Sequence, residues 1–355
     1  MKTNSEILLY AQLNFPIFQN RMYETESLAL SCPKGDIEIV QDLETGLVYN
    51  RAFKPELMIY DSNYQNEQGV SGLFRDHLRS VANIVERLIG KHAIAEIGCG
   101  KGAFLELPLA DGCDVVGFDP TYEGENPLVK REYFTSTYGR QMEGFVMRHV
   151  LEHVMDPVSL LSKIKEANSG KGKIYIEVPC LDWIIEHNAW FDLFYEHVNY
   201  FRLDDFKRMF GSVLECGHVF GGQYLYVVAD LATLKTPVAN SQALINPKQF
   251  VKFDYLYKPQ KEENVAIWGG ASKGVVFALL GSRAGFEIST IIDLNPAKQG
   301  MYLAATGLKV QSPADGLSQL SPGSTIFVMN SNYLEEIRKE SNNLYDYVCI
   351  DSVAK

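Results

Sequence analysis

The stretch AEIGCGKGAF, residues 95–104, decides the predicted fold of this 355-residue chain. Gly98, Gly100 and Gly102 follow an apolar run that predicts a strand, and they precede a run that predicts a helix. Glycine allows the backbone to turn sharply and to approach a ligand closely. We therefore expect a ligand-binding turn that joins a strand to a helix.

Two acidic residues accompany this turn. Glu96 lies two positions before the first glycine, and Asp119 ends the next predicted strand, CDVVGFD. An acid at the end of the second strand suits the two hydroxyl groups of a ribose. The spacing GxGxG differs from the dinucleotide pattern GxGxxG, and no lysine–serine pair follows as in a P-loop. From the turn alone, a dinucleotide-binding site stays open as an alternative.

Predicted strands and helices alternate around the turn and indicate a doubly wound α/β sheet whose last two strands form an antiparallel edge hairpin. The pattern predicts strands at 92–98, 113–119, 144–148, 172–178, 213–220 and 222–230, and helices at 71–90, 102–110, 156–167 and 203–210. Asp156 and Ser312 each precede a proline, the arrangement of an N-cap followed by proline at the first helical position.

The chain divides into four predicted segments. Residues 1–70 form a small strand-rich domain, with a hairpin at 37–50, and residues 71–230 form the domain that contains the glycine turn. Residues 231–262 are poor in large apolar side chains and read as a linker. Residues 263–355 alternate strand and helix again, which predicts a smaller Rossmann-like α/β domain.

Composition narrows the class of protein. Apolar residues make up 46% and charged residues 22%, values typical of a globular chain, and the net charge of −11 argues against a nucleic-acid partner. No apolar run is long enough for a membrane span, and the first residues carry no cleavage site of a signal peptide. The six scattered cysteines form no CxxC motif, so we expect a cytoplasmic protein without disulfides.

The glycine turn and its acids resemble the class I S-adenosylmethionine-dependent methyltransferases, as does HVLEHVMDP at 149–157. The resemblance implies a Rossmann-like methyltransferase domain and S-adenosylmethionine as cofactor. It also implies that the cofactor-binding residues are Glu96, the three glycines of the turn, Asp119 and His149, with the glycines at the methionine part and Asp119 at the ribose.

Most of the chain also resembles the three-domain C-methyltransferases that act on nucleotide-linked keto-deoxysugars. This likeness is carried by WGGASKG at 268–274, DLNPAKQG at 293–300 and YEHVNYF at 195–201. In that chemistry a base removes a proton beside a ketone, and the resulting enolate attacks the cofactor's methyl group. The resemblance implies His197 as the base, with Glu196 as its neighbour, and His153 in the same cavity. Tyr64 would act from a lid.

Two departures from that family affect the interpretation. The family's N-terminal zinc site needs four cysteines, whereas this region contains only Cys32, so we expect no zinc there and assign no metal ligands. The family commonly reads Tyr-His-Glu-His where this chain reads Phe194-Tyr195-Glu196-His197. These changes leave the acceptor atom open.

Two other functions therefore stay as alternatives. One is O- or N-methylation of a carbohydrate or natural-product acceptor. The other is a non-catalytic nucleotide-binding protein that works through its C-terminal domain. At single positions, His153 also fits a structural hydrogen bond to a helix end, and GGASKG (269–274) fits either a phosphate cradle with Lys273 or a plain structural turn. The sequence leaves the oligomeric state unassigned.

Overall fold

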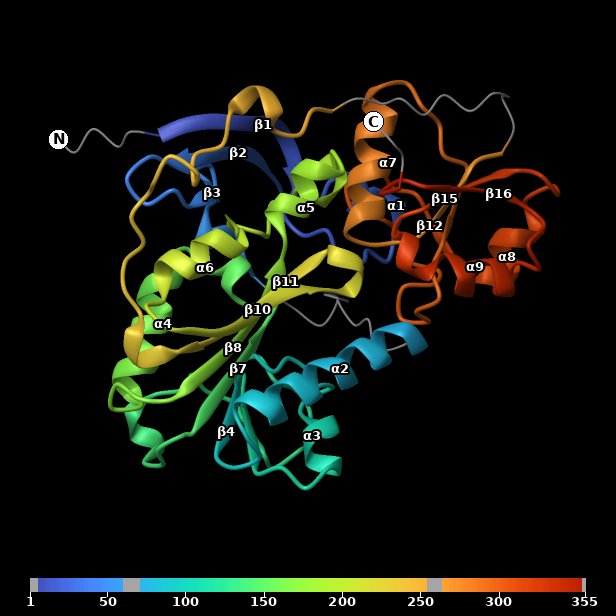
Figure 1. Ribbon diagram of the computed structural model, residues 1–355. Helices are drawn as coiled ribbons and strands as arrows, with labels where there is room; N and C mark the ends of the chain where they lie inside the picture. The colour runs from blue at the N-terminus through green and yellow to red at the C-terminus, as the bar shows by residue number, and fades with distance from the viewer. Residues whose placement is uncertain (1–5, 60–70, 254–263, 353–355) are drawn as a thin grey trace.

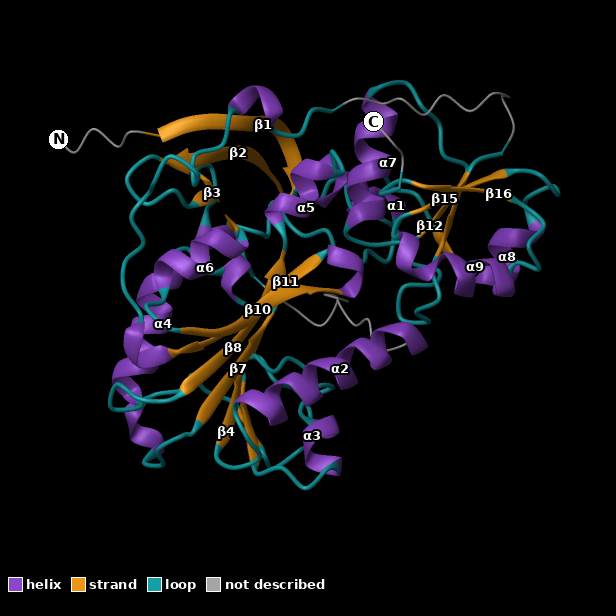
Figure 2. Cartoon of the chain, viewed as in Figure 1, coloured by secondary structure: helices purple, strands orange, loops and turns teal. Residues whose placement is uncertain are grey.

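The computed structural model describes residues 6–59, 71–253 and 264–352, and it arranges them around three sheets (Figures 1 and 2). The N-terminal sheet is antiparallel and has the order β1-β2-β3-β9. Its strands are β1 (Glu6–Pro16), β2 (Lys34–Asp42), β3 (Val48–Asn50) and β9 (Asn199–Tyr200), with the short helix α1 (Glu26–Leu30) after β1. The hairpin predicted at 37–50 is confirmed as β2 and β3.

The central sheet has seven strands in the order β10-β11-β8-β7-β4-β5-β6. Strands β4 to β8 run parallel, while β11 pairs antiparallel with both β8 and β10, so the predicted doubly wound sheet with an edge hairpin is confirmed. The bounds are β4 (Ile94–Ile97), β5 (Val115–Phe118), β6 (Val129–Lys130), β7 (Gly144–Arg148), β8 (Lys173–Pro179), β10 (Val213–Val219) and β11 (Tyr224–Asp230).

Helices flank this sheet, with α2 and α3 on one side and α4 and α6 on the other (Figure 1). Their bounds are α2 (Gly72–Leu88), α3 (Glu106–Ala110), α4 (Pro157–Ala167) and α6 (Leu203–Met209); the short helix α5 (Leu181–Glu186) follows β8. The cap predicted at Asp156 is confirmed, because its Oδ1 accepts a hydrogen bond from the Ser159 amide at 2.8 Å. The helix predicted at 102–110 is too long: it begins only at Glu106, because Gly102 still has a left-handed φ of 83°.

The third sheet is parallel, with the order β14-β13-β12-β15-β16, and α7 (Lys273–Arg283) packs beside it. Its strands are β12 (Ala266–Trp268), β13 (Thr290–Ile292), β14 (Val310–Gln311), β15 (Thr325–Val328) and β16 (Asp346–Cys349), and its other helices are α8 (Pro313–Ser318) and α9 (Leu334–Glu340). The order 3-2-1-4-5 is that of a Rossmann-like fold.

The segment 190–201 lies where the three sheets meet. Trp190 stacks on Phe277 of α7 with ring centroids 5.7 Å apart, and Tyr200 pairs with Val48 of the N-terminal sheet. The segment predicted as the methyltransferase-type domain, residues 71–230, therefore supplies strand β9 to the N-terminal sheet. The four predicted domain boundaries remain predictions. Among the described residues, no helix is both long and apolar enough to cross a bilayer.

Candidate active site

The glycine turn lies at the carboxyl end of β4, the central parallel strand of its sheet. Gly98, Gly100 and Gly102 have φ values of 70°, 53° and 83°, in the left-handed region that favours glycine. The Gly100 amide donates a hydrogen bond to Oδ2 of Asp119 at 2.9 Å. The acid after β5 therefore holds the turn in shape, next to the edge where ligands bind in open α/β sheets.

The turn leaves room for a bound molecule. A Cβ atom built on Gly100 would meet no other atom within 4 Å, whereas one on Gly98 would lie 2.5 Å from Val150. Among the described residues, Oε2 of Glu96 is buried and has no hydrogen-bond partner. An open glycine cradle, a buried acceptor and the Asp119 carboxylate fit S-adenosylmethionine, which carries an ammonium group and a ribose.

Glu96 lies in an environment that disfavours its charge. Burial, the largest effect, and the charge of Asp119 together outweigh the positive charge of Arg148 and raise the pKa of Glu96 to about 8. Without a ligand, Glu96 is therefore largely protonated at neutral pH. A cationic ligand at the turn would favour its ionised form.

A second buried acid, Glu177 at the end of β8, organises a polar network beside the turn. Its Oε1 accepts hydrogen bonds from Arg148 Nη2 at 2.9 Å and lies 3.2 Å from Nε2 of both His77 and His149. Its Oε2 accepts from the Tyr175 hydroxyl at 2.8 Å. Burial opposes its ionisation, but the charge of Arg148 and the two histidines outweigh it and hold the pKa of Glu177 well below its usual range.

His149 connects this network to the loop after β7. Its Nδ1 lies 3.2 Å from Oε1 of Glu152, and its ring packs on Tyr224 with centroids 4.5 Å apart. Burial lowers the pKa of His149, but Glu152 and Glu177 outweigh that effect and raise it to about 9. His149 is thus a cation between two carboxylates. Its backbone has a left-handed φ of 52°.

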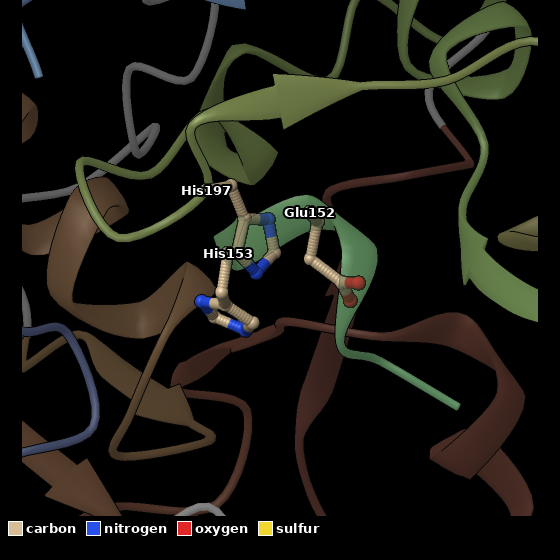
Figure 3. Close-up of side chains that lie close together, drawn as sticks. All are labelled: Glu152, His153 and His197. Atoms are coloured by element: carbon tan, nitrogen blue, oxygen red, sulfur yellow. The ribbon is translucent and has the colours of Figure 1, made fainter. Parts of the chain in front are cut away.

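Two further histidines lie close together beside the loop after β7 (Figure 3). His153 comes from the turn after β7, and His197 comes from the segment that leads into β9; their ring centroids lie 4.9 Å apart. Nδ1 of His153 lies 2.9 Å from the backbone carbonyl oxygen of Glu196, which accepts its hydrogen bond. Burial, followed by the neighbouring charges of His153 and His149, lowers the pKa of His197 well below its usual value. His197 is therefore a neutral imidazole at neutral pH.

The Glu196 side chain is bound to the N-terminal segment. Its Oε1 accepts hydrogen bonds from the Gln19 amide at 3.1 Å and from Asn20 Nδ2 at 3.5 Å. Asn20 in turn accepts a hydrogen bond from the Ser272 hydroxyl at 2.8 Å. Glu196 thus ties the histidine segment, through residues 19–20, to the second glycine-rich turn.

Lys273, at the start of α7, also reaches the histidine segment. Its Nζ lies 3.1 Å from Oδ2 of Asp192, donates to Gln223 Oε1 at 2.9 Å, and lies 4.9 Å from the ring centroid of Trp183. Both charged side chains are mostly buried. These contacts favour the structural interpretation of Lys273 over a phosphate ligand.

A cavity of about 220 Å³ lies at the carboxyl ends of β12, β13 and β15. The Gly270 amide donates to Oδ2 of Asp293 at 2.8 Å, the same turn-to-acid bond that Gly100 makes with Asp119. Lys298 lies 3.2 Å from that carboxylate. The wall also includes Tyr224 of the central sheet, whose ring contacts His149. Tyr224 therefore lies between this cavity and His149.

Comparison with known proteins agrees with this geometry. Residues 73–213 match the family model described as a methyltransferase domain. These residues are a class I S-adenosylmethionine-dependent methyltransferase domain.

The same comparisons found relatives and similar structures of this methyltransferase. The C-methyltransferase NovU from Streptomyces niveus is 21% identical in an alignment that covers 75% of this chain and 74% of NovU. The plantazolicin methyltransferase BpumL in complex with SAH is 15% identical, with a TM-score of 0.36 over 47% of this chain and 88% of that one. A SAM-dependent methyltransferase from Archaeoglobus fulgidus is 20% identical, with a TM-score of 0.31, and the match covers 44% of this chain and 98% of that one.

The methyltransferase thus brings most of the residues singled out in the sequence to one edge of its central sheet. Glu96, the three glycines and Asp119 form the turn, and His149 and His153 follow β7, close to His197. Tyr64 lies outside the described residues. Sequence reasoning missed Glu152 and Glu177, although an acid within the apolar strand KIYIEVP was a usable signal for Glu177.

Proposed function

We propose that this methyltransferase methylates a nucleotide-linked keto-deoxysugar at the carbon beside its ketone. The observation that carries the proposal is the neutral, partly buried imidazole of His197 next to His153, at the sheet edge that contains the cofactor turn. A neutral imidazole in an apolar surrounding is suited to remove a proton from carbon. The likeness to NovU, a C-methyltransferase, supports the same chemistry.

In this proposal the residues of the chain have separate tasks. A ring nitrogen of His197 accepts the proton as the C–H bond breaks, and the electron pair moves to the ketone oxygen. His153, whose Nδ1–H donates to the Glu196 carbonyl, would line the acceptor pocket beside the base. Phe194, with its ring 4.8 Å from that of His197, excludes water from the base.

S-adenosylmethionine, when bound, supplies an electrophilic methyl group. The residues that would hold it are those of the glycine turn with Glu96 and Asp119. Asp119 would accept hydrogen bonds from the ribose hydroxyls, and Glu96 would accept from the ammonium group. Both carboxylates lie near the carboxyl ends of β4 and β5, and His149 lies at the carboxyl end of β7.

The cavity of the third sheet supports an acceptor in which a sugar is linked to a nucleotide. Its Gly270–Asp293 bond repeats the geometry of a ribose-binding turn, and Lys298 offers a cation. Because Tyr224, a wall residue of this cavity, packs on His149, a nucleotide held there would direct its attached sugar toward the loop after β7.

The test is a transfer assay with S-adenosylmethionine that carries a deuterated methyl group. The protein is incubated with a panel of nucleotide-linked 4-keto-6-deoxysugars, and the products are read by mass spectrometry. One labelled methyl group on a sugar carbon, placed by fragmentation, is the expected result. A label on oxygen or nitrogen would contradict C-methylation and favour the O- or N-methyltransferase. Cofactor binding without transfer to any panel member would reject this acceptor class.

A further inference from the structure

We propose that Glu152, His153 and His197 form a binding site for a divalent transition-metal cation of the Zn²⁺ type. Each of the three residues offers one ligand atom, and these atoms all lie within 4.8 Å of one another. Glu152 and His153 are adjacent in the turn after β7, and His197 reaches them from the segment before β9 (Figure 3). The site therefore forms only when the chain is folded.

One of the ligands, His153, is already oriented. The Glu196 carbonyl accepts a hydrogen bond from Nδ1 of His153, so the proton lies on Nδ1 and the lone pair of Nε2 is available. This is the arrangement in which an outer hydrogen bond fixes the tautomer of a metal-binding histidine.

The Glu152 carboxylate gives a second reason to expect a cation, independent of the His153 hydrogen bond. Glu152 is 1% exposed, and its Oε1 is held by His149 at 3.2 Å. Among the described residues, its Oε2 is buried without a hydrogen-bond partner. A buried carboxylate oxygen with no donor is costly, and a cation would satisfy it.

The donor set selects the kind of cation. Two imidazoles and one carboxylate suit Zn²⁺, Co²⁺ or Fe²⁺ better than Mg²⁺ or Ca²⁺, which prefer oxygen ligands. Bonds of about 2.0–2.2 Å require the three atoms to approach one another by roughly 1 Å, a side-chain movement. Three protein ligands would leave at least one coordination position open.

Occupation of the site would block methyl transfer, a consequence that rests on the proposed function. The cation and the acceptor's proton compete for the same imidazole of His197. Bound Zn²⁺ would therefore inhibit the enzyme reversibly, and a chelator would restore activity.

The binding test needs no acceptor. The full-length protein is freed of metal with a chelator and titrated with Co²⁺, followed by visible absorption, and with Zn²⁺, followed by calorimetry. We expect one cation per chain, with affinity at least about tenfold weaker in Glu152→Gln, His153→Gln and His197→Gln. His218→Gln, at an exposed position on β10, is the matched control and should bind like the parent.

Absence of one-to-one binding would overturn the site, as would binding that the three variants leave unchanged. Circular dichroism of each variant checks that it is folded. Binding together with inhibition supports both proposals. Binding without inhibition supports the site and removes His197 as the base, so the two proposals fail separately.

Discussion

Nδ1 of His153 and the backbone carbonyl oxygen of Glu196 lie 2.9 Å apart and form a hydrogen bond. This bond joins the turn after β7 to the segment before β9, which is 43 residues further along the chain. Since the Glu196 side chain binds residues 19 and 20, the N-terminal segment helps to set the position of both histidines. The catalytic predictions depend on this arrangement.

His197→Gln should lower the turnover of methyl transfer by roughly 10²- to 10⁴-fold, because it removes the proposed base. Cofactor affinity, measured by calorimetry, should stay unchanged, since His197 lies outside the glycine turn. His218→Gln is the control. Full activity of His197→Gln would remove this residue as the base.

The same base predicts an unusual pH profile. Burial lowers the pKa of His197 well below its usual value, so the imidazole stays unprotonated as the pH falls through about 6.5, the ordinary histidine pKa. We expect kcat/KM of the parent enzyme to show no decline near that pH. A decline with a midpoint near 6.5 would contradict the assignment of His197 as the base.

Asp119→Ala should weaken S-adenosylmethionine binding by about 1–3 kcal/mol, the usual cost of losing hydrogen bonds to a charged group. Asp119→Asn, which keeps one acceptor oxygen, should lose less. Asp111→Ala, at the exposed end of α3, removes the same charge and serves as control. Unchanged affinity of Asp119→Ala in calorimetry would reject the ribose site.

Glu96 should make the protein less stable as the pH rises. Because burial raises its pKa to about 8, the folded state keeps a proton that the unfolded state releases above its ordinary pKa of 4.5. Unfolding then releases a proton, and stability falls between pH 4.5 and about 8. Thermal unfolding of Glu96→Gln across this range should lack that part of the decline. If the melting temperatures of the variant and the parent fall equally with pH over this range, the assigned role of Glu96 is wrong.

Lys273 and Asp192 should stabilise each other across the junction of α7 and the histidine segment. Removal of either partner leaves a buried charge, so Lys273→Met and Asp192→Asn should each lower the melting temperature. A double-mutant cycle should give a coupling of at least about 1 kcal/mol. The exposed pair Arg79–Asp76 is the control and should give about 0–0.5 kcal/mol. A coupling as small as that of the control would contradict the prediction.

Local signals in the sequence identified most strands and helices of the central sheet. The three glycines marked the turn at 98–102, apolar periodicity marked the strands, and Asp156 with Pro157 marked the start of α4. These features depend on near neighbours in the chain. The length of α3 was misjudged because apolar composition does not show where a turn ends and a helix begins.

The sequence by itself determined a methyltransferase sheet with its cofactor turn, since both follow from residues close together in the chain. Only the tertiary structure decided that Glu177 gathers Arg148, His77 and His149, and that Glu152 lies with His153 and His197. These groups come from different elements and are brought together by sheet order. Their pKa shifts follow from burial and from charges that the sequence does not show as neighbours.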